Sequence, residues 1–171
     1  MIGWSGCPDA TAKSPTVARG WQCALTVPRE LSMRDDKLCQ QPVHEIERMR
    51  GDCVCATGGE TVEEPGRLFD LVVSCEGAQV IELEIRKGVF VRYADGMLTL
   101  DMGDEGYGRD QRSIELSELR DLRVLSDTTM VEIFANGGEA ALTSRTYSPA
   151  VPAMGLHAEG AASMDFYRLA H

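Results

Sequence analysis

The sequence has 171 residues, of which 43% are hydrophobic, and it carries a formal net charge of −10. This length suits one ordinary domain with room for part of another, and the hydrophobic share is too high for a disordered chain. The acidic balance argues against nucleic acid and anionic membranes as partners, because both are bound chiefly through Lys and Arg. No run approaches the roughly 18 apolar residues of a membrane helix, and the N-terminus does not resemble a signal peptide.

The charge is distributed unevenly along the chain. Residues 1–51 carry seven Lys and Arg against six Asp and Glu, a net +1, whereas residues 52–171 carry ten against twenty-one, a net −11. Such a shift indicates that the two parts have different neighbours, and it predicts a boundary near Gly51.

The first part of the chain reads as short strands followed by a helix. Residues 3–8 read as a strand ending in a turn, and residues 21–27 form an apolar run. A hairpin is expected where Asp35 and Asp36 separate two short apolar segments. Residues 43–50 predict a short linker helix, because apolar side chains recur every three residues and acidic residues precede basic ones.

From residue 52 onward the pattern changes to the period of two that is typical of strands. In residues 81–85 three aliphatic side chains alternate with two glutamates, which predicts a strand with one buried and one solvent-exposed face. The turn residues Asp95-Gly96 and Asn136-Gly137-Gly138 favour tight connections. Further strands are expected at residues 69–73, 89–93, 97–102, 122–125, 131–134, 141–146 and 164–169. The pattern predicts an all-β fold, an antiparallel β-sandwich, although a barrel or a jelly roll would read much the same.

All six cysteines lie in the first half of the chain, at Cys7, Cys23, Cys39, Cys53, Cys55 and Cys75. Their spacing contains no C-x-x-C pair, so we expect no metal site, and no motif calls for a cofactor. Several sit among apolar residues, where a free thiol acts as a small hydrophobe. We therefore expect reduced, buried cysteines and a cytoplasmic location.

Three stretches in the right order resemble glycoside hydrolase family 32, the invertase and fructanase family. Residues 20–31 (GWQCALTVPREL) resemble its "GW…LT.PREL" signature, and residues 37–43 (KLCQQPV) resemble the passage into its linker helix. Residues 126–139 (SDTTMVEIFANGGE) are similar to its "D.S.vEiF.ndGe" hairpin, and the following Thr143-Ser144-Arg145 matches too. Together the stretches extend over almost the whole chain.

The resemblance implies a division into three parts. Residues 1–42 would be the remnant of the last blade of a catalytic β-propeller, residues 43–51 the linker helix and residues 52–171 the C-terminal β-sandwich. The family's retaining chemistry needs two carboxylates about 5 Å apart. The family motifs that supply them, "NDPNG" and "EC", and its "RDP" motif are absent from this sequence. We therefore expect no catalytic residue and no hydrolysis by this chain alone.

Four residues are candidates for a role in binding or in joining the two parts. Trp4 lies in a stretch resembling the family's "GWmG" strand and would line the sugar pocket of an intact enzyme, or be a core residue. Arg29 and Glu30 would form an ion pair that fixes the end of the blade. Glu132 points away from its apolar neighbours, and the sequence favours a solvated face over a paired glutamate against a partner domain.

The remaining polar candidates have plainer interpretations. The three histidines, His44, His157 and His171, have no acid or thiol at ligand spacing and are expected at the surface. Tyr107 lies in the glycine-rich segment 103–112, which we interpret as a mobile loop rather than a contact for sugar or a subunit.

The sequence supports one principal function and leaves two alternatives open. The principal hypothesis is a non-catalytic module that stabilises a catalytic β-propeller and helps to form a homodimer. The propeller would be present in the same chain (in cis) or in another chain (in trans). The alternatives are an independent module that binds a fructose-containing saccharide, which only the sandwich architecture favours, and one half of a split family 32 hydrolase.

Overall fold

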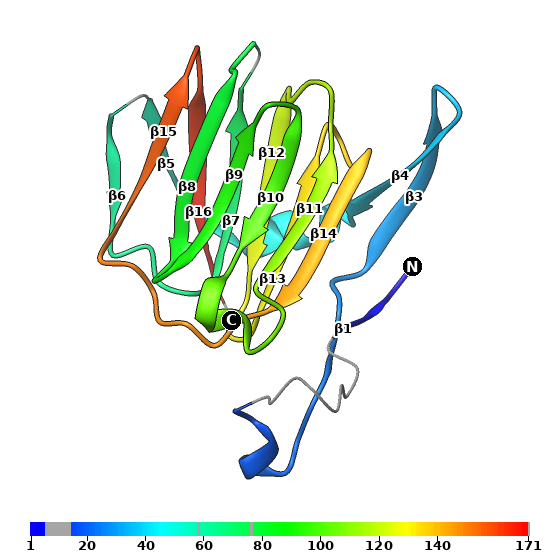
Figure 1. The fold of residues 1–171 in the computed structure, drawn as a ribbon, viewed down its shortest axis with the longest axis vertical. Helices are drawn as coiled ribbons and strands as arrows, with labels where there is room; N and C mark the ends of the chain where they lie inside the picture. Colours follow the sequence, from blue (N-terminus) through cyan, green and yellow to red (C-terminus); the bar gives the residue numbers. More distant parts are fainter. Residues whose placement is uncertain (6–14, 58, 76, 171) are drawn as a thin grey trace.

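The computed structural model describes residues 1–5, 15–57, 59–75 and 77–170, and it is built almost entirely of antiparallel strands. Two six-stranded sheets face one another as a sandwich (Figure 1). The strand order is β11-β10-β9-β8-β15-β6 in the first sheet and β14-β13-β12-β7-β16-β5 in the second. Two small two-stranded sheets, β1-β2 and β3-β4, precede the sandwich. The antiparallel β-sandwich predicted from the sequence is confirmed.

The described residues form sixteen strands and three short 3₁₀ helices. The strands before the sandwich are β1 (Trp4–Ser5), β2 (Ala24–Leu25), β3 (Arg29–Arg34) and β4 (Lys37–Pro42). Those of the sandwich are β5 (Arg50–Thr57), β6 (Thr61–Glu63), β7 (Phe69–Ser74), β8 (Val80–Arg86), β9 (Val89–Ala94), β10 (Met97–Asp101), β11 (Gln111–Glu115), β12 (Asp121–Ser126), β13 (Met130–Ala135), β14 (Ala140–Arg145), β15 (Ala153–Glu159) and β16 (Ser163–Leu169). The 3₁₀ helices are η1 (Val17–Arg19), η2 (His44–Met49) and η3 (Gly103–Gly106).

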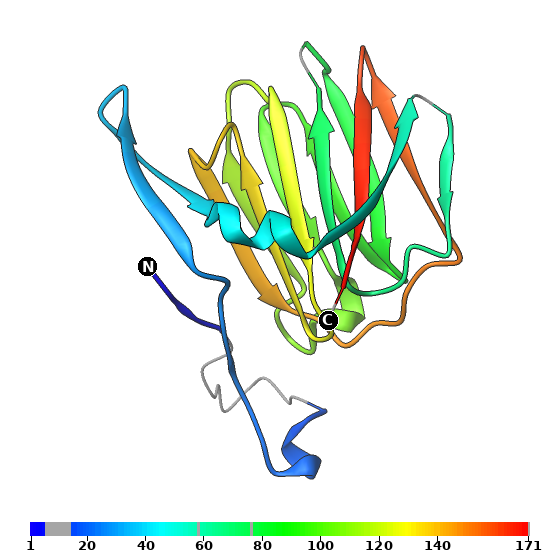
Figure 2. The same cartoon turned by 180° about the vertical axis from the view of Figure 1, so that it is seen from behind.

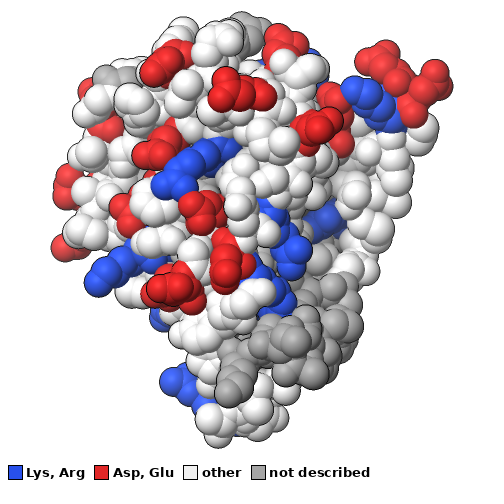
Figure 3. All heavy atoms as spheres, in the orientation of Figure 1, with Lys and Arg blue, Asp and Glu red and all other residues white. Residues whose placement is uncertain are grey.

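The core lies between the two large sheets and follows the alternation of the sequence. Ile81, Leu83 and Ile85 of β8 are buried, and Phe69, Leu71 and Val73 of β7 meet them from the opposite sheet. Successive side chains on a strand point to opposite faces, so the charged residues between them face outward. Acidic side chains are accordingly spread over the outer face of the first sheet (Figure 3).

Three tight turns follow the turn chemistry expected from the sequence. Asp95 and Gly96 both have positive φ, 50° and 71°, as a two-residue hairpin turn between β9 and β10 requires. Asp35 and Asp36 do the same between β3 and β4. Asn136-Gly137-Gly138 form the turn between β13 and β14, all with positive φ.

One cation is buried at the end of β8. Arg86 is fully buried, and burial lowers the pKa of its guanidinium to about 10. Its Nε donates to Ser126 Oγ at 3.1 Å, and its two terminal nitrogens donate to the carbonyls of Ser148, Arg67 and Asp127. This side chain therefore ties several connecting segments together through neutral acceptors.

The N-terminal strands lie outside the sandwich. The β3-β4 hairpin stands beside β14, and β1-β2 lie next to it (Figures 1 and 2). Helix η2 then crosses the outer face of the second sheet before the chain enters β5 (Figure 2). The linker helix is of the 3₁₀ type, which has three residues per turn. This period accounts for the three-residue spacing of Val43, Ile46 and Met49.

Several sequence-based expectations need correction. Only Ala24–Leu25 is a strand within the apolar run 21–27, and the expected strand 3–8 is described only at Trp4–Ser5, with the rest of it and Cys7 outside the described residues. The expectation of buried cysteines is wrong for Cys53 and Cys55, which are exposed; among the described thiols, only Cys39 and Cys75 are buried. In the part of the chain that the structure describes, no helix is long and apolar enough to cross a membrane.

Candidate functional site at the junction of the N-terminal strands and the sandwich

Arg29 and Glu132 form a buried ion pair between β3 and β13. Arg29 is 8% exposed and Glu132 1% exposed. Arg29 Nη2 donates to Glu132 Oε2 and also to Thr143 Oγ1 at 2.7 Å. The other carboxylate oxygen of Glu132 accepts from the backbone N–H of Val27 at 2.7 Å. Both charges are thereby paired and hydrogen-bonded, which a buried ion pair needs in order to offset desolvation.

Two expectations about these residues are wrong. Glu132 does not face solvent; it meets the N-terminal strands, which was the less favoured interpretation. Arg29 does not pair with Glu30, because neighbouring residues on a strand point to opposite faces. Glu30 is exposed instead, and its Oε1 lies 3.8 Å from His44 Nδ1.

The turn between β13 and β14 holds the β3-β4 hairpin by its backbone. Gln40 N donates to Gly138 O at 2.9 Å, and a Cβ atom on Gly138 would lie 2.0 Å from Gln40 O. Arg34 donates to the carbonyls of Asn136 and Gly137, and Lys37 pairs with Glu139. The approach is so close that only glycine fits at position 138.

A second buried carboxylate lies on the outer face of the same sheet, near η2. Asp70 is fully buried, and its two oxygens accept from Arg123 at 3.0 and 2.7 Å. Arg50, where the chain passes from η2 into β5, donates to Asp70 at 2.7 Å. Two guanidinium groups thus hold one carboxylate and fix the entry of the chain into the sandwich.

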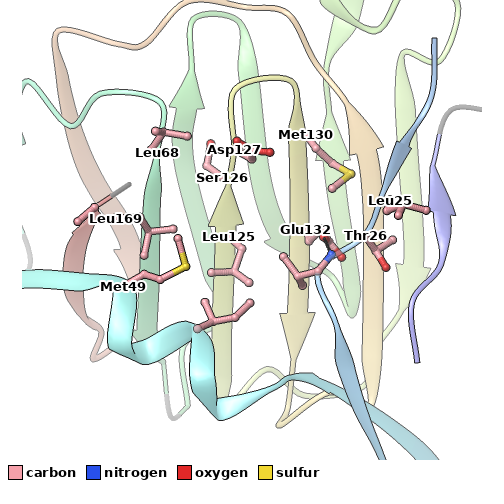
Figure 4. A pocket seen from close by; sticks show the side chains of 13 residues that line it. Leu25, Thr26, Met49, Leu68, Leu125, Ser126, Asp127, Met130, Glu132 and Leu169 are labelled. Carbon is pink, nitrogen blue, oxygen red and sulfur yellow. Dashed lines mark hydrogen bonds between the residues drawn. The ribbon is translucent and has the colours of Figure 1, made fainter. Parts of the chain in front are cut away.

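A pocket of about 280 Å³ lies beside Glu132, where β2 and η2 meet the outer face of the second sheet (Figure 4). Leu125 and Met130 from the sandwich, Leu25 from β2 and Met49 from η2 contribute its apolar wall. Glu132 and Thr26 lie close together on one side (Figure 4), but the Glu132 carboxylate is already engaged by Arg29 and Val27. The pocket therefore offers mainly apolar surface, and it lies at the junction of the N-terminal strands and the sandwich.

Comparison with known proteins places both sides of this junction in one family. Residues 1–42 match the sequence model for the glycosyl hydrolases family 32 N-terminal domain, and residues 90–169 match that for the glycosyl hydrolases family 32 C terminal region. The chain belongs to glycosyl hydrolase family 32.

Curated relatives support this assignment, and solved structures share the fold. The raffinose invertase of Escherichia coli is 36% identical over 175 residues, covering 88% of this chain and 34% of the relative. The sucrose-6-phosphate hydrolase of Salmonella typhimurium is 31% identical over 88% of this chain and 32% of its own length. The structure of sucrose-6-phosphate hydrolase from Lactobacillus gasseri superposes with a TM-score of 0.83 over 99% of this chain, at 21% identity and over 38% of that chain. The chain thus spans about a third of the length of its curated relatives.

The exo-inulinase of Aspergillus awamori extends the likeness in fold beyond sucrose-6-phosphate hydrolases. Its structure superposes with a TM-score of 0.74 over 99% of this chain and 40% of that chain, at 20% identity. At this identity the likeness concerns the fold alone.

The candidate residues of the family 32 chain lie in different places. Trp4 pairs through its backbone with Leu25, and its side chain is outside what the structure describes. Tyr107 ends η3 and is 40% exposed, with its ring edge-on to Tyr147 at 5.7 Å. Segment 103–112 is therefore partly ordered as η3 and the start of β11.

The histidines agree with the sequence interpretation as far as they are described. His44 and His157 are exposed, and His171 lies outside the described residues. His44 Nδ1 is 3.4 Å from the carboxylate of Glu45. The junction is therefore built on Arg29, Glu132, Gly138 and their partners.

Proposed function

We propose that this chain supplies the C-terminal part of a family 32 β-fructofuranosidase, in which the sandwich holds the propeller in its working geometry. The observation that carries the proposal is the Arg29–Glu132 pair. Arg29 lies in the region that resembles the family's N-terminal domain, and Glu132 in the region that resembles its C-terminal part. A buried pair at this position ties the two regions together in a fixed orientation.

The proposal divides the chain into a blade remnant at residues 1–42, a linker at residues 43–51 and a sandwich at residues 52–171. Exposed apolar side chains on the N-terminal strands support a further partner surface there. Leu31, Met33 and Leu38 are 48%, 66% and 53% exposed. Covering such side chains stabilises an interface by about 25 cal/mol per Å² of apolar area. We propose that the other strands of a propeller, in cis or in trans, provide this cover.

The proposed activity belongs to the assembled enzyme. It would cleave sucrose, sucrose 6-phosphate or a fructan with carboxylates that lie outside this sequence, and this chain alone would release no fructose. The relatives' names, raffinose invertase and sucrose-6-phosphate hydrolase, support this substrate class. We further propose a cytoplasmic location. We also propose a homodimer, and size-exclusion chromatography at two protein concentrations would test that oligomeric state.

Complementation in trans tests the proposed role. The part of the Escherichia coli raffinose invertase that this chain does not match would be produced separately and mixed with this chain. We expect sucrose hydrolysis in the mixture and in neither part alone. The matched third of the invertase itself is the positive control. If that control restores activity and this chain, checked for folding, does not, the proposed role is wrong.

A saccharide-binding role remains a second candidate because Tyr107 offers an exposed aromatic ring beside Tyr147. Aromatic faces suit the C–H surfaces of sugars, and Trp4 would supply another. Calorimetric titration with sucrose, fructose and a short inulin tests this role. Binding that is lost in Tyr107→Ala or Trp4→Ala supports it, and an absence of heat with all three sugars contradicts it.

A further inference from the structure

Cys53, Cys55 and Asp165 form an exposed group of metal-ligand atoms away from the junction. Cys53 and Cys55 are separated by one residue on the edge strand β5, so their side chains point to the same face. Their Sγ atoms lie 3.3 Å apart. Asp165 on β16 lies directly opposite Cys55, and Tyr167 lies opposite Cys53. The two sulfur atoms and a carboxylate oxygen all lie within 4.8 Å of one another.

We propose that Cys53, Cys55 and Asp165 bind a thiophilic divalent cation of the zinc class. Around tetrahedral zinc, with Zn–S bonds of about 2.3 Å, two thiolates sit about 3.8 Å apart and a thiolate and a carboxylate oxygen about 3.6 Å apart. To reach that geometry the two Sγ atoms, now 3.3 Å apart, have to separate by about 0.5 Å, and the sulfur–oxygen separations, at most 4.8 Å, have to close by at most about 1.2 Å. Three protein ligands leave a fourth position open to water, as zinc sites with an exchangeable ligand do.

A divalent cation bound here would hold both sulfurs as thiolates beside the Asp165 carboxylate, so its binding would release their protons. Tyr167 interacts with Cys53, and the Arg50 guanidinium carbon lies 4.3 Å from the centre of the Tyr167 ring. The phenol can therefore orient the sulfur, as outer contacts do in metal sites.

This site was not predicted from the sequence, because it depends on a carboxylate more than a hundred residues beyond the thiols. Spacing alone does not show a ligand set in which a C-x-C pair on one strand meets Asp165 on the neighbouring strand. The expectation that no metal site exists rested on the absent C-x-x-C and is replaced here by a proposal.

Metal titration of the full chain tests the site. The protein is reduced with a phosphine, freed of metal, and titrated with Cd²⁺ while the thiolate-to-cadmium absorption is recorded; Zn²⁺ affinity follows by competition with a chromophoric chelator. We expect one ion per chain. Cys53→Ser and Cys55→Ser should each weaken binding by at least about tenfold, and Asp165→Asn by about tenfold, while Cys23→Ser should bind as the parent does.

A second readout needs no substitution. Zn²⁺ should protect Cys53 and Cys55 from alkylation, read residue by residue by mass spectrometry, and leave the labelling of Cys23 unchanged. Equal labelling with and without Zn²⁺ would overturn the proposal, as would unchanged affinity in both cysteine variants. Unchanged affinity in Asp165→Asn alone would overturn the role of the carboxylate.

Discussion

Arg29 Nη2 donates a hydrogen bond to Glu132 Oε2 across a separation of 103 residues. The pair joins the first residue of β3 to the middle of β13, and Thr143, Gln40 and the Val27 amide add further hydrogen bonds to it. Both side chains are buried, so neither charge can exchange its partner for water. The position of the N-terminal strands therefore depends on a contact that no local sequence feature provides.

Glu132→Gln tests the importance of this pair. The substitution keeps the shape of the side chain but leaves the Arg29 guanidinium buried without a counter-charge. We expect a loss of about 3–5 kcal/mol in the free energy of docking the N-terminal strands. Hydrogen exchange should rise in residues 24–42 and stay unchanged in β7 and β12.

The exposed pair Lys37–Glu139 is the matched control. Lys37 is 60% exposed, so Lys37→Gln should cost less than about 1 kcal/mol. Equal effects of the two substitutions would contradict the importance assigned to burial at Glu132.

Gly138→Ala should displace the β3-β4 hairpin from the sandwich. The new Cβ would lie 2.0 Å from Gln40 O, and φ at this position is +86°. Gly20→Ala separates these two causes, because Gly20 has φ of +79° and nothing within 4 Å of the added atom. We expect Gly20→Ala to show only the cost of backbone strain, about 1–2 kcal/mol. Limited proteolysis near residue 43 should be accelerated in Gly138→Ala alone.

Arg86→Met should destabilise the sandwich strongly despite its similar length. It removes the donor that serves Ser126 Oγ and three carbonyl groups in the interior. We expect a loss of about 3–5 kcal/mol in the free energy of unfolding, measured in urea. Arg92→Met on the outer face, where the pairs with Glu82 and Asp101 are solvent-accessible, should cost less than about 1 kcal/mol.

The buried thiol of Cys75 should make stability depend on alkaline pH. Burial, helped by the charge of Asp121, raises the pKa of Cys75 from 9.0 to about 12. A raised pKa in the folded state gives stability that is complete below pH 9 and is lost as the pH rises toward 12. Comparison with Cys75→Ser isolates this thiol from other alkaline groups. The stability advantage of the parent over the variant should shrink between pH 7 and pH 11, and a constant difference would contradict the assignment.

The strands that the sequence predicted and those that it missed differ in position. The central strands β8 and β9 bury mainly one face and β13 is buried on both, so alternation or an apolar run reveals each of them. Three missed strands, β5, β6 and β11, lie at sheet edges, where most of their side chains are exposed and no apolar period forms. The fourth, β15, is interrupted by Gly155 and His157, which weaken the pattern.

The junction was only partly predictable. The turn Asn136-Gly137-Gly138 was expected from its residues, but the approach of Gln40 to Gly138 depends on tertiary placement. Alternation correctly turned Glu132 away from the core of the sandwich, yet it cannot say whether that outer face meets water or another segment. The resemblance to the propeller family raised the second option, and the general rarity of buried charges weighed against it.

The pairing of β5 with β16 has a consequence for biosynthesis. β5 begins at Arg50 and β16 ends at Leu169, and the two are neighbours at one edge of the second sheet. A ribosome therefore has to deliver more than a hundred residues before the first strand of the sandwich meets its hydrogen-bonding neighbour. Until then the thiols of β5 and the apolar residues of the second sheet are open to chaperones and to other nascent chains.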